Sequence, residues 1–203
     1  EEYKEEIDSK DKEIEKLSKE YPSNVSYLSI LAQNYLSKNN LNKALGYMKE
    51  IEKIDSSNIE NIVALMEFYY KKGDIPLTEI YIDKLCRSTE MNFEEKNQLI
   101  LGLYQEMVDT DLETLRKYIK HLETMSSMYS EEGRLWQFLS IGYMRTFRIN
   151  EAYQACKKAI KYGIEDISLY KNYIITQQFK AGDEERIKTC DEAIKLYPRE
   201  VLF

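Results

Sequence analysis

Two consecutive stretches of 34 residues decide the fold. Residues 25–58 read VSYLSILAQNYLSKNNLNKALGYMKEIEKIDSSN, and residues 59–92 read IENIVALMEFYYKKGDIPLTEIYIDKLCRSTEMN. Places 4, 7, 8, 11, 20 and 27 hold Leu28, Leu31, Ala32, Tyr35, Ala44 and Ile51 in the first stretch, and Ile62, Leu65, Met66, Tyr69, Thr78 and Leu85 in the second. Because places 4, 7, 8 and 11 share one face of a helix, each stretch predicts a pair of packed helices.

The same spacing returns in the C-terminal half, counted from Gly133 and from Ile167. The corresponding residues are Trp136, Leu139, Ser140, Tyr143, Ala152 and Ala159, and then Tyr170, Tyr173, Ile174, Gln177, Arg186 and Ala193. The intervening stretch, residues 93–132, has 40 residues and is six longer than the repeat. We expect the extra residues to lengthen its helices or the connection near Val108 to Asp111.

This register predicts a single array. Residues 1–24 are expected to form the second helix of a preceding pair or a cap, and residues 201–203 to begin a further helix. Between them we place repeats at residues 25–58, 59–92, 133–166 and 167–200, and an irregular longer repeat at residues 93–132. Because the terminal units of a complete array need polar outer faces, the apolar residues 201–203 predict that the natural protein continues.

Turn-forming residues separate the helices within a pair. Asn39–Asn40 and Gly73–Asp74 stand between the halves of the first two repeats, and Ala181–Gly182–Asp183 in the last. Gly and Asn tolerate a positive φ, and Asn and Asp cap helices. Pro76 follows in the first turn of a second helix, where its missing N–H costs little.

These positions carry a resemblance to the tetratricopeptide repeat (TPR) family over essentially the whole chain. The family's pattern is a large residue, Leu, a small residue and Tyr on a first helix, then Ala twice on a second, although Leu28 and Ile62 replace its usual Trp. The resemblance implies an all-α fold, a right-handed α-α superhelix (TPR solenoid) of antiparallel helix pairs. The chain is also similar to interior stretches of long bacterial TPR proteins of the cell envelope. We therefore expect a fragment of such a protein, in the envelope or periplasm, with the cytoplasm as the alternative.

Composition excludes several other classes. The 29 Lys plus Arg against 36 Asp plus Glu give a net charge of −7, which argues against a nucleic-acid partner. No run of 18 apolar residues occurs, so membrane insertion is not expected. Cys86, Cys156 and Cys190 are widely spaced without a CxxC pair, which favours small apolar core residues over a metal site.

Nothing in the sequence predicts catalysis. His121 is the single histidine, so any nucleophile–histidine pair would need it, and we expect an ordinary structural role for it. The phosphate-binding, zinc-protease and serine-hydrolase motifs are absent. We therefore expect no enzyme and no cofactor.

The resemblance implies a concave face lined by the first helices at places 2, 5, 6, 9, 12 and 13. In the first two repeats these places hold Ser29, Ile30, Gln33, Leu36, Val63, Ala64, Glu67, Tyr70 and Lys71. The candidate partner-binding residues are Tyr70, Lys71, Gln98, Tyr104, Arg134, Phe138, Arg145, Lys171 and Asn172. The face is apolar and weakly acidic toward the N-terminal half and basic toward the C-terminal half. An extended peptide with apolar anchors and an acidic group suits it, but an ordinary solvated scaffold face fits equally well.

The hypothesis that follows is a non-catalytic protein–protein interaction module or scaffold that binds a peptide or partner protein on its concave face. Two alternatives stay open: a structural spacer within a longer solenoid, and the regulatory TPR part of a larger enzyme. The Lys–Asn clamp with which some TPR domains hold chaperone C-termini is disfavoured, because Ser29, Gln33 and Ala64 occupy its places. The oligomeric state is left open.

Overall fold

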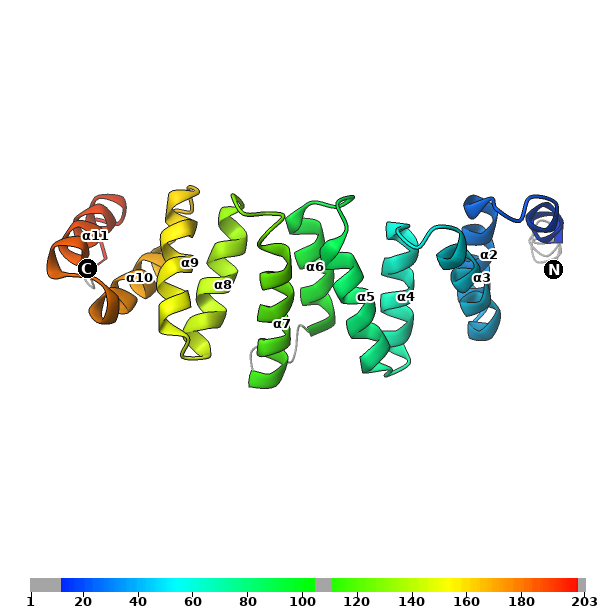
Figure 1. Ribbon diagram of the computed structural model, residues 1–203, viewed down its shortest axis with the longest axis horizontal. Helices are drawn as coiled ribbons and strands as arrows, with labels where there is room; N and C mark the ends of the chain where they lie inside the picture. Colours follow the sequence, from blue (N-terminus) through cyan, green and yellow to red (C-terminus); the bar gives the residue numbers. More distant parts are fainter. Residues whose placement is uncertain (1–11, 105–110, 201–203) are drawn as a thin grey trace. The chain divides into compact units, whose positions relative to one another are not determined.

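The computed structural model describes residues 12–104 and 111–200 (Figure 1). This part of the chain consists of helices and turns without a strand, so the predicted all-α class is confirmed. Residues 12–20 are helical, and they are followed by α2 (Val25–Ser37), α3 (Leu41–Ile54), α4 (Ile59–Lys71), α5 (Ile75–Arg87), α6 (Phe93–Tyr104), α7 (Leu112–Met125), α8 (Gly133–Arg145), α9 (Ile149–Lys161), α10 (Ile167–Lys180) and α11 (Asp183–Leu196).

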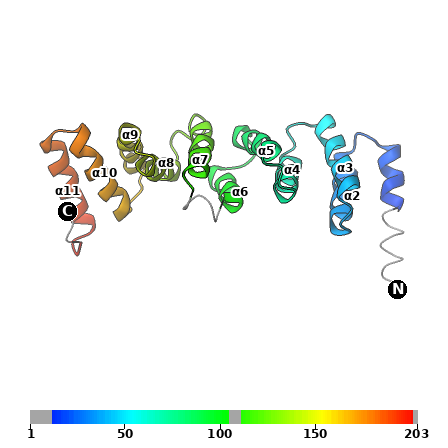
Figure 2. The same ribbon diagram turned by 90° about the horizontal axis from the view of Figure 1, so that it is seen from below.

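The helices pack as consecutive pairs in two compact units, which we call the first unit (Glu1–Glu90) and the second unit (Met91–Phe203). The first unit contains the pairs α2–α3 and α4–α5, and the second contains α6–α7, α8–α9 and α10–α11. Figure 2 shows α8 and α9 lying side by side.

The first helices of the five pairs begin at the residues from which the sequence repeats are counted: Val25, Ile59, Phe93, Gly133 and Ile167. The division of the chain into repeats with these boundaries remains a prediction. Residues 1–11, expected to belong to a preceding helix or cap, and residues 201–203, expected to begin a further helix, lie outside the described residues.

Side-chain oxygens cap the N-termini of most helices. Those of Asn24, Asn40, Asn58, Asp74, Asp111, Glu132 and Asp166 each accept a hydrogen bond from a backbone N–H in the first turn of the helix that follows. An Asn or Asp cap of this kind is worth about 1 kcal/mol. Two of these caps, Asn40 and Asp74, lie in turns that the sequence predicts. Among the described residues, no side chain caps α9 or α11, so the cap expected in the turn at Gly182–Asp183 does not form.

Two of the three predicted turns use the left-handed backbone region, but the third does not, because Gly182 between α10 and α11 has φ −73°. Asn39 has φ 56° and Gly73 has φ 75°, and Pro76 lies in the first turn of α5. The equivalent position between α8 and α9 is Phe147, with φ 59°. Sequence reasoning did not anticipate an aromatic residue in that conformation.

Small side chains let the helices approach closely, as the repeat pattern requires. Ala44 and Ala152, both at place 20, are fully buried. At Gly142 of α8, a Cβ atom would lie 2.7 Å from Cγ1 of Ile119 in α7, the second helix of the preceding pair. There is therefore no room for a larger residue at position 142. Close packing at these points is what fixes each helix against its neighbours.

The α6–α7 pair departs from the pattern through the buried face of its first helix. The buried residues of α6 stand at places 1, 4, 5, 8 and 12 instead of 4, 7, 8 and 11; they are Phe93, Lys96, Asn97, Ile100 and Tyr104. These places have the spacing of 4, 7, 8 and 11 but stand three residues earlier, so the buried face of α6 is shifted relative to the repeat register. Its buried Lys96 places Nζ 5.0 Å from the ring centroid of Tyr129.

Within the described residues, α6 and α7 have 12 and 14 residues, and α7 is no longer than α3. The connection from α7 to α8, residues 126–132, is longer than the corresponding residues 55–58 between α3 and α4. Of the insertion expected near Val108 to Asp111, residues 108–110 lie outside the described residues, and Asp111 is the N-cap of α7.

Candidate functional site

A groove of about 380 Å³ opens on the first unit between α2 and α4. Its apolar lining includes Leu36 of α2 and Val63, Ala64 and Phe68 of α4. Leu36 remains 36% exposed, which is unusual for a leucine surrounded by other apolar side chains. The remaining lining residues are Gln33, Leu41, Glu60, Glu67, Lys71 and Lys72.

A smaller recess of about 40 Å³ continues from the groove into the core. The recess and the groove share Gln33, Leu36, Glu60 and Ala64, and the recess also reaches Met48, Ile51 and Asn61. A single water needs roughly 10–15 Å³ of such space. The recess can therefore hold a small polar group.

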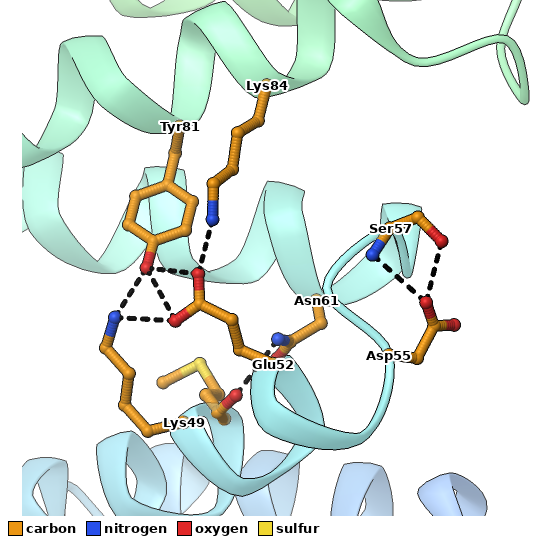
Figure 3. A network of polar contacts seen from close by, with 8 residues as sticks. Lys49, Glu52, Asp55, Ser57, Asn61, Tyr81 and Lys84 are labelled. Carbon is orange, nitrogen blue, oxygen red and sulfur yellow. Dashed lines mark hydrogen bonds and ion pairs between the residues drawn. The ribbon is translucent and has the colours of Figure 1, made fainter.

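Asn61, one of the residues that line the recess, has a buried acceptor without a partner in the described part of the chain. Its Nδ2 donates a hydrogen bond of 3.0 Å to the backbone oxygen of Met48 in α3 (Figure 3). Its Oδ1 has no hydrogen-bond partner among the described residues, and the residue is only 5% exposed. Leaving a buried acceptor unpaired costs about 1–3 kcal/mol, so this oxygen favours a donor that the folded chain does not supply.

The charges along the groove differ between its two ends. Glu60 stands at the first turn of α4 and has no ion pair within the described part of the chain, whereas Lys72 follows the last residue of α4. With a rise of 1.5 Å per residue, the two are about 18 Å apart along the helix. Between them Glu67 pairs with Lys71 at 3.6 Å. The groove thus has an acidic end, next to Asn61, and a basic end.

An ion network joins the second helices α3 and α5 of the same unit (Figure 3). Glu52 accepts hydrogen bonds from Nζ of Lys84 at 2.6 Å, Nζ of Lys49 at 2.8 Å and the hydroxyl of Tyr81 at 2.9 Å. Burial alone would raise the pKa of Glu52, but these donors outweigh it and lower that pKa to about 2. The network holds two helix pairs together, and each of its members is already satisfied.

Of the two candidate residues in the first unit, one lines the groove. Lys71 stands at its basic end. Tyr70 is 40% exposed on the same helix but does not line the groove. Five other residues expected on the concave face do meet there: Gln33, Leu36, Val63, Ala64 and Glu67.

The candidate residues of the second unit are spread over α6, α8 and α10. Gln98 and Arg134 are exposed, and Arg145 and Asn172 are half-buried. The ring of Phe138 lies 6.4 Å from that of Phe93. Lys171 forms an ion pair with Glu200 at 3.4 Å. Their part in partner binding stays a prediction.

Tyr104 is a correction. We expected it to face the concave side, but it is 8% exposed, its ring stacks on that of His121 with centroids 6.1 Å apart, and its hydroxyl lies 3.2 Å from His121 Nε2. The shift of the buried face of α6 by three residues brings place 12 into the core. Both Tyr104 and His121 are therefore packing residues.

Sequence reasoning missed several residues of the groove and recess: Leu41, Glu60, Asn61, Phe68 and Lys72. Glu60, Asn61 and Phe68 stand at places 2, 3 and 10 of their repeat. Place 2 is among the concave positions, so Glu60 could have been selected. Nothing in the pattern distinguishes Asn61, because the acceptor is left unpaired only by the packing of α3 against α4.

Other kinds of site find no support in the described residues. No group of three or more His, Cys, Asp or Glu side chains lies close enough there to hold a metal ion. None of the helices in residues 12–104 and 111–200 has the length and hydropathy needed to cross a bilayer. Cys86 and Cys156 are buried and Cys190 is half-buried, and burial raises the pKa of the Cys156 thiol to about 12.

Comparison with solved structures identifies the architecture. The chain superposes on the crystal structure of YrrB, described as a TPR protein with an unusual peptide-binding site, with a TM-score of 0.50 and 17% identity over 93% of this chain and 94% of that one. The chain adopts the tetratricopeptide repeat fold. A crystal structure of MamA protein is less similar, with a TM-score of 0.46 and 18% identity over 85% of this chain and 91% of that one.

No protein-family model matches the chain. A TPR repeat-containing protein of Methanocaldococcus jannaschii is 23% identical over 154 residues, which are 74% of this chain and 27% of the relative. The matched part of the chain thus spans about a quarter of the length of that relative.

Proposed function

We propose that this TPR chain is a non-catalytic protein-interaction module whose first unit binds an apolar segment of a partner protein. The observation that carries the proposal is the groove between α2 and α4, where Leu36, Val63 and Phe68 line about 380 Å³ of open space. Leu36 and Val63 are partly exposed and Phe68 is buried; partly exposed apolar side chains around a concavity are typical of a peptide-binding surface. The peptide-binding site named for YrrB is consistent with this role.

The groove suits one or two apolar side chains of a bound peptide, whose main chain can bond to amides such as that of Gln33. The exposed Gln98 and Arg134 of the second unit extend the proposal to a further contact surface for the same partner. The alternative function, as the regulatory part of a larger enzyme, would use the same binding surface. The catalytic residues of that enzyme would then lie outside this chain.

Selection from a random library of 12-residue peptides displayed on phage, against the purified chain, tests the proposal. Enriched peptides are synthesised, and their affinities for the wild type and for Leu36→Glu are measured by fluorescence anisotropy. We expect Leu36→Glu to weaken binding about tenfold or more, because it places a charge against the apolar ligand. The matched control is Ile80→Glu, since Ile80 is 51% exposed on α5 and does not line the groove.

Helicity and thermal stability are compared for both variants by circular dichroism. If Leu36→Glu loses binding and Ile80→Glu does not, the result supports the groove as the peptide-binding site. Equal affinity in both variants, or no enriched peptide, refutes it and favours the structural spacer.

A further inference from the structure

We infer that the partner segment bound in the groove carries a basic side chain, Lys or Arg, next to its apolar residues, and that this side chain enters the recess at Asn61. The inference rests on the proposed function and names the ligand chemistry that the site selects. The recess opens from the acidic end of the groove, and its lining includes both Glu60 and Asn61.

The hydrogen-bonding groups of the recess argue for a donor. Because the Nδ2 of Asn61 is held by the backbone oxygen of Met48, its amide is oriented and its Oδ1 is left as an acceptor (Figure 3). The carboxylate of Glu60 adds acceptors only. A ligand that brings an acceptor or an acid would leave Oδ1 unpaired and face a negative charge.

The charge balance argues for a cationic donor. Glu60 has no ion pair among the described residues, whereas Glu67 of the same groove is paired with Lys71. A Lys or Arg side chain has an aliphatic stem that can pack on Leu36 and Ala64 while its charged head reaches the recess. Charge-assisted hydrogen bonds are about twice as strong as neutral ones, so this head group satisfies Glu60 and Asn61 together.

The size of the recess agrees with this assignment. At about 40 Å³ it is too small for a large apolar side chain but exceeds the space of one water. An ammonium or the end of a guanidinium fits. The apolar residues of the ligand then lie in the wider part of the groove, on Val63 and Phe68.

A double-mutant cycle between peptide and protein tests the inference. The probe is the tightest peptide from the 12-residue library, in two forms: as selected, and with its basic residue replaced by Met. Both are measured against the wild type, Asn61→Leu and Glu60→Lys. The matched control is Glu50→Lys, since Glu50 is exposed on α3 outside the groove and gives the chain the same net charge.

On the wild type and on Glu50→Lys we expect the Met form to bind about tenfold or more weakly than the basic form. On Asn61→Leu and Glu60→Lys the two forms should bind with nearly equal affinity. Asn61→Leu is close in size to the native residue, and its folding is checked by its thermal midpoint.

Two results overturn the inference. The first is that the selected peptides lack Lys and Arg. The second is that the Met form binds more weakly than the basic form by the same factor on all four proteins. In either case the recess does not bind a basic group. Dependence of those peptides on Leu36 would leave the proposed function standing. Peptides that do not depend on Leu36 would refute the proposed function and the inference together.

Discussion

Tyr143 donates a hydrogen bond of 2.9 Å to Glu123, which stands 20 residues earlier, and so joins α8 to the second helix of the preceding pair. Tyr35 makes the same bond to Glu15, again 20 residues earlier. Burial and the hydrogen bond to Glu123 raise the pKa of Tyr143. At Tyr35 and Tyr143, the tyrosine at place 11 therefore also links its helix by a hydrogen bond to a helix that precedes it.

Removing this link should destabilise the chain. We expect Tyr143→Phe to lower the free energy of unfolding by about 1 kcal/mol, the usual net worth of such a hydrogen bond. The matched control is Tyr69→Phe, because Tyr69 occupies the same place but its hydroxyl has no hydrogen bond among the described residues. Urea denaturation followed by circular dichroism measures both. Equal losses in the two variants would show that the Glu123 bond contributes nothing.

The helix pairs could be predicted because the repeat fixes which side chains are buried, and Leu31, Leu65 and Leu139, all at place 7, are fully buried. The buried face of α6 could not be predicted, because the six extra residues of this repeat leave its register undetermined. Tyr104 shows the consequence: its place in the repeat indicated exposure, but the shifted buried face of α6 includes it.

The candidate groove was partly predictable for the same reason. Positions such as Leu36 and Val63 follow from the geometry of the first helices, which the repeat defines. The recess does not, because the unpaired Oδ1 of Asn61 arises where α4 meets the backbone of Met48. A repeat pattern describes the packing of side chains but carries no information on which polar atom is left without a partner.

The Glu52 network predicts an acid-dependent loss of stability. The pKa of Glu52 is about 2 in the folded chain against an ordinary value of 4.5, so the ionised form is favoured by folding. Its contribution is present above pH 4.5 and is lost as pH falls from 4.5 toward 2. Allowing for the 20% exposure of the side chain, we expect about 1–3 kcal/mol.

Glu52→Gln should therefore lower stability at neutral pH and flatten the dependence of stability on pH between 4.5 and 2. Urea midpoints measured across this range test it. Glu50→Gln is the control, because Glu50 is exposed on the same helix and should leave the pH dependence unchanged. An unchanged slope in Glu52→Gln would refute the assignment.

Two helical glycines should respond oppositely to alanine. At Gly46 of α3 a Cβ atom would meet nothing within 4 Å, so Gly46→Ala should stabilise the chain by about 1 kcal/mol through helix propensity. At Gly142 the Cβ would lie 2.7 Å from Ile119 Cγ1, and overpacking of about 1–3 kcal/mol outweighs that gain. Thermal midpoints should rise in the first variant and fall in the second; a rise in both would mean that α7 and α8 can separate without cost.

Phe147 should be replaceable with a gain in stability. It has φ 59° and is 85% exposed, whereas Asn39 holds the same position of the turn between α2 and α3 with φ 56°. An aromatic residue is strained in the left-handed region, and asparagine tolerates it. Because Phe147 buries little surface in return, we expect Phe147→Asn to raise the free energy of unfolding by about 0.5–1 kcal/mol.

The matched control for this substitution is Phe179→Asn. Phe179 is 65% exposed and lines the same shallow hollow as Phe147, but it lies within α10, where no left-handed strain is relieved. Its replacement should leave the urea midpoint unchanged or slightly lower. A similar gain in both variants would attribute the effect to lost apolar exposure, and a loss in Phe147→Asn would show that the ring contributes packing that outweighs the backbone strain.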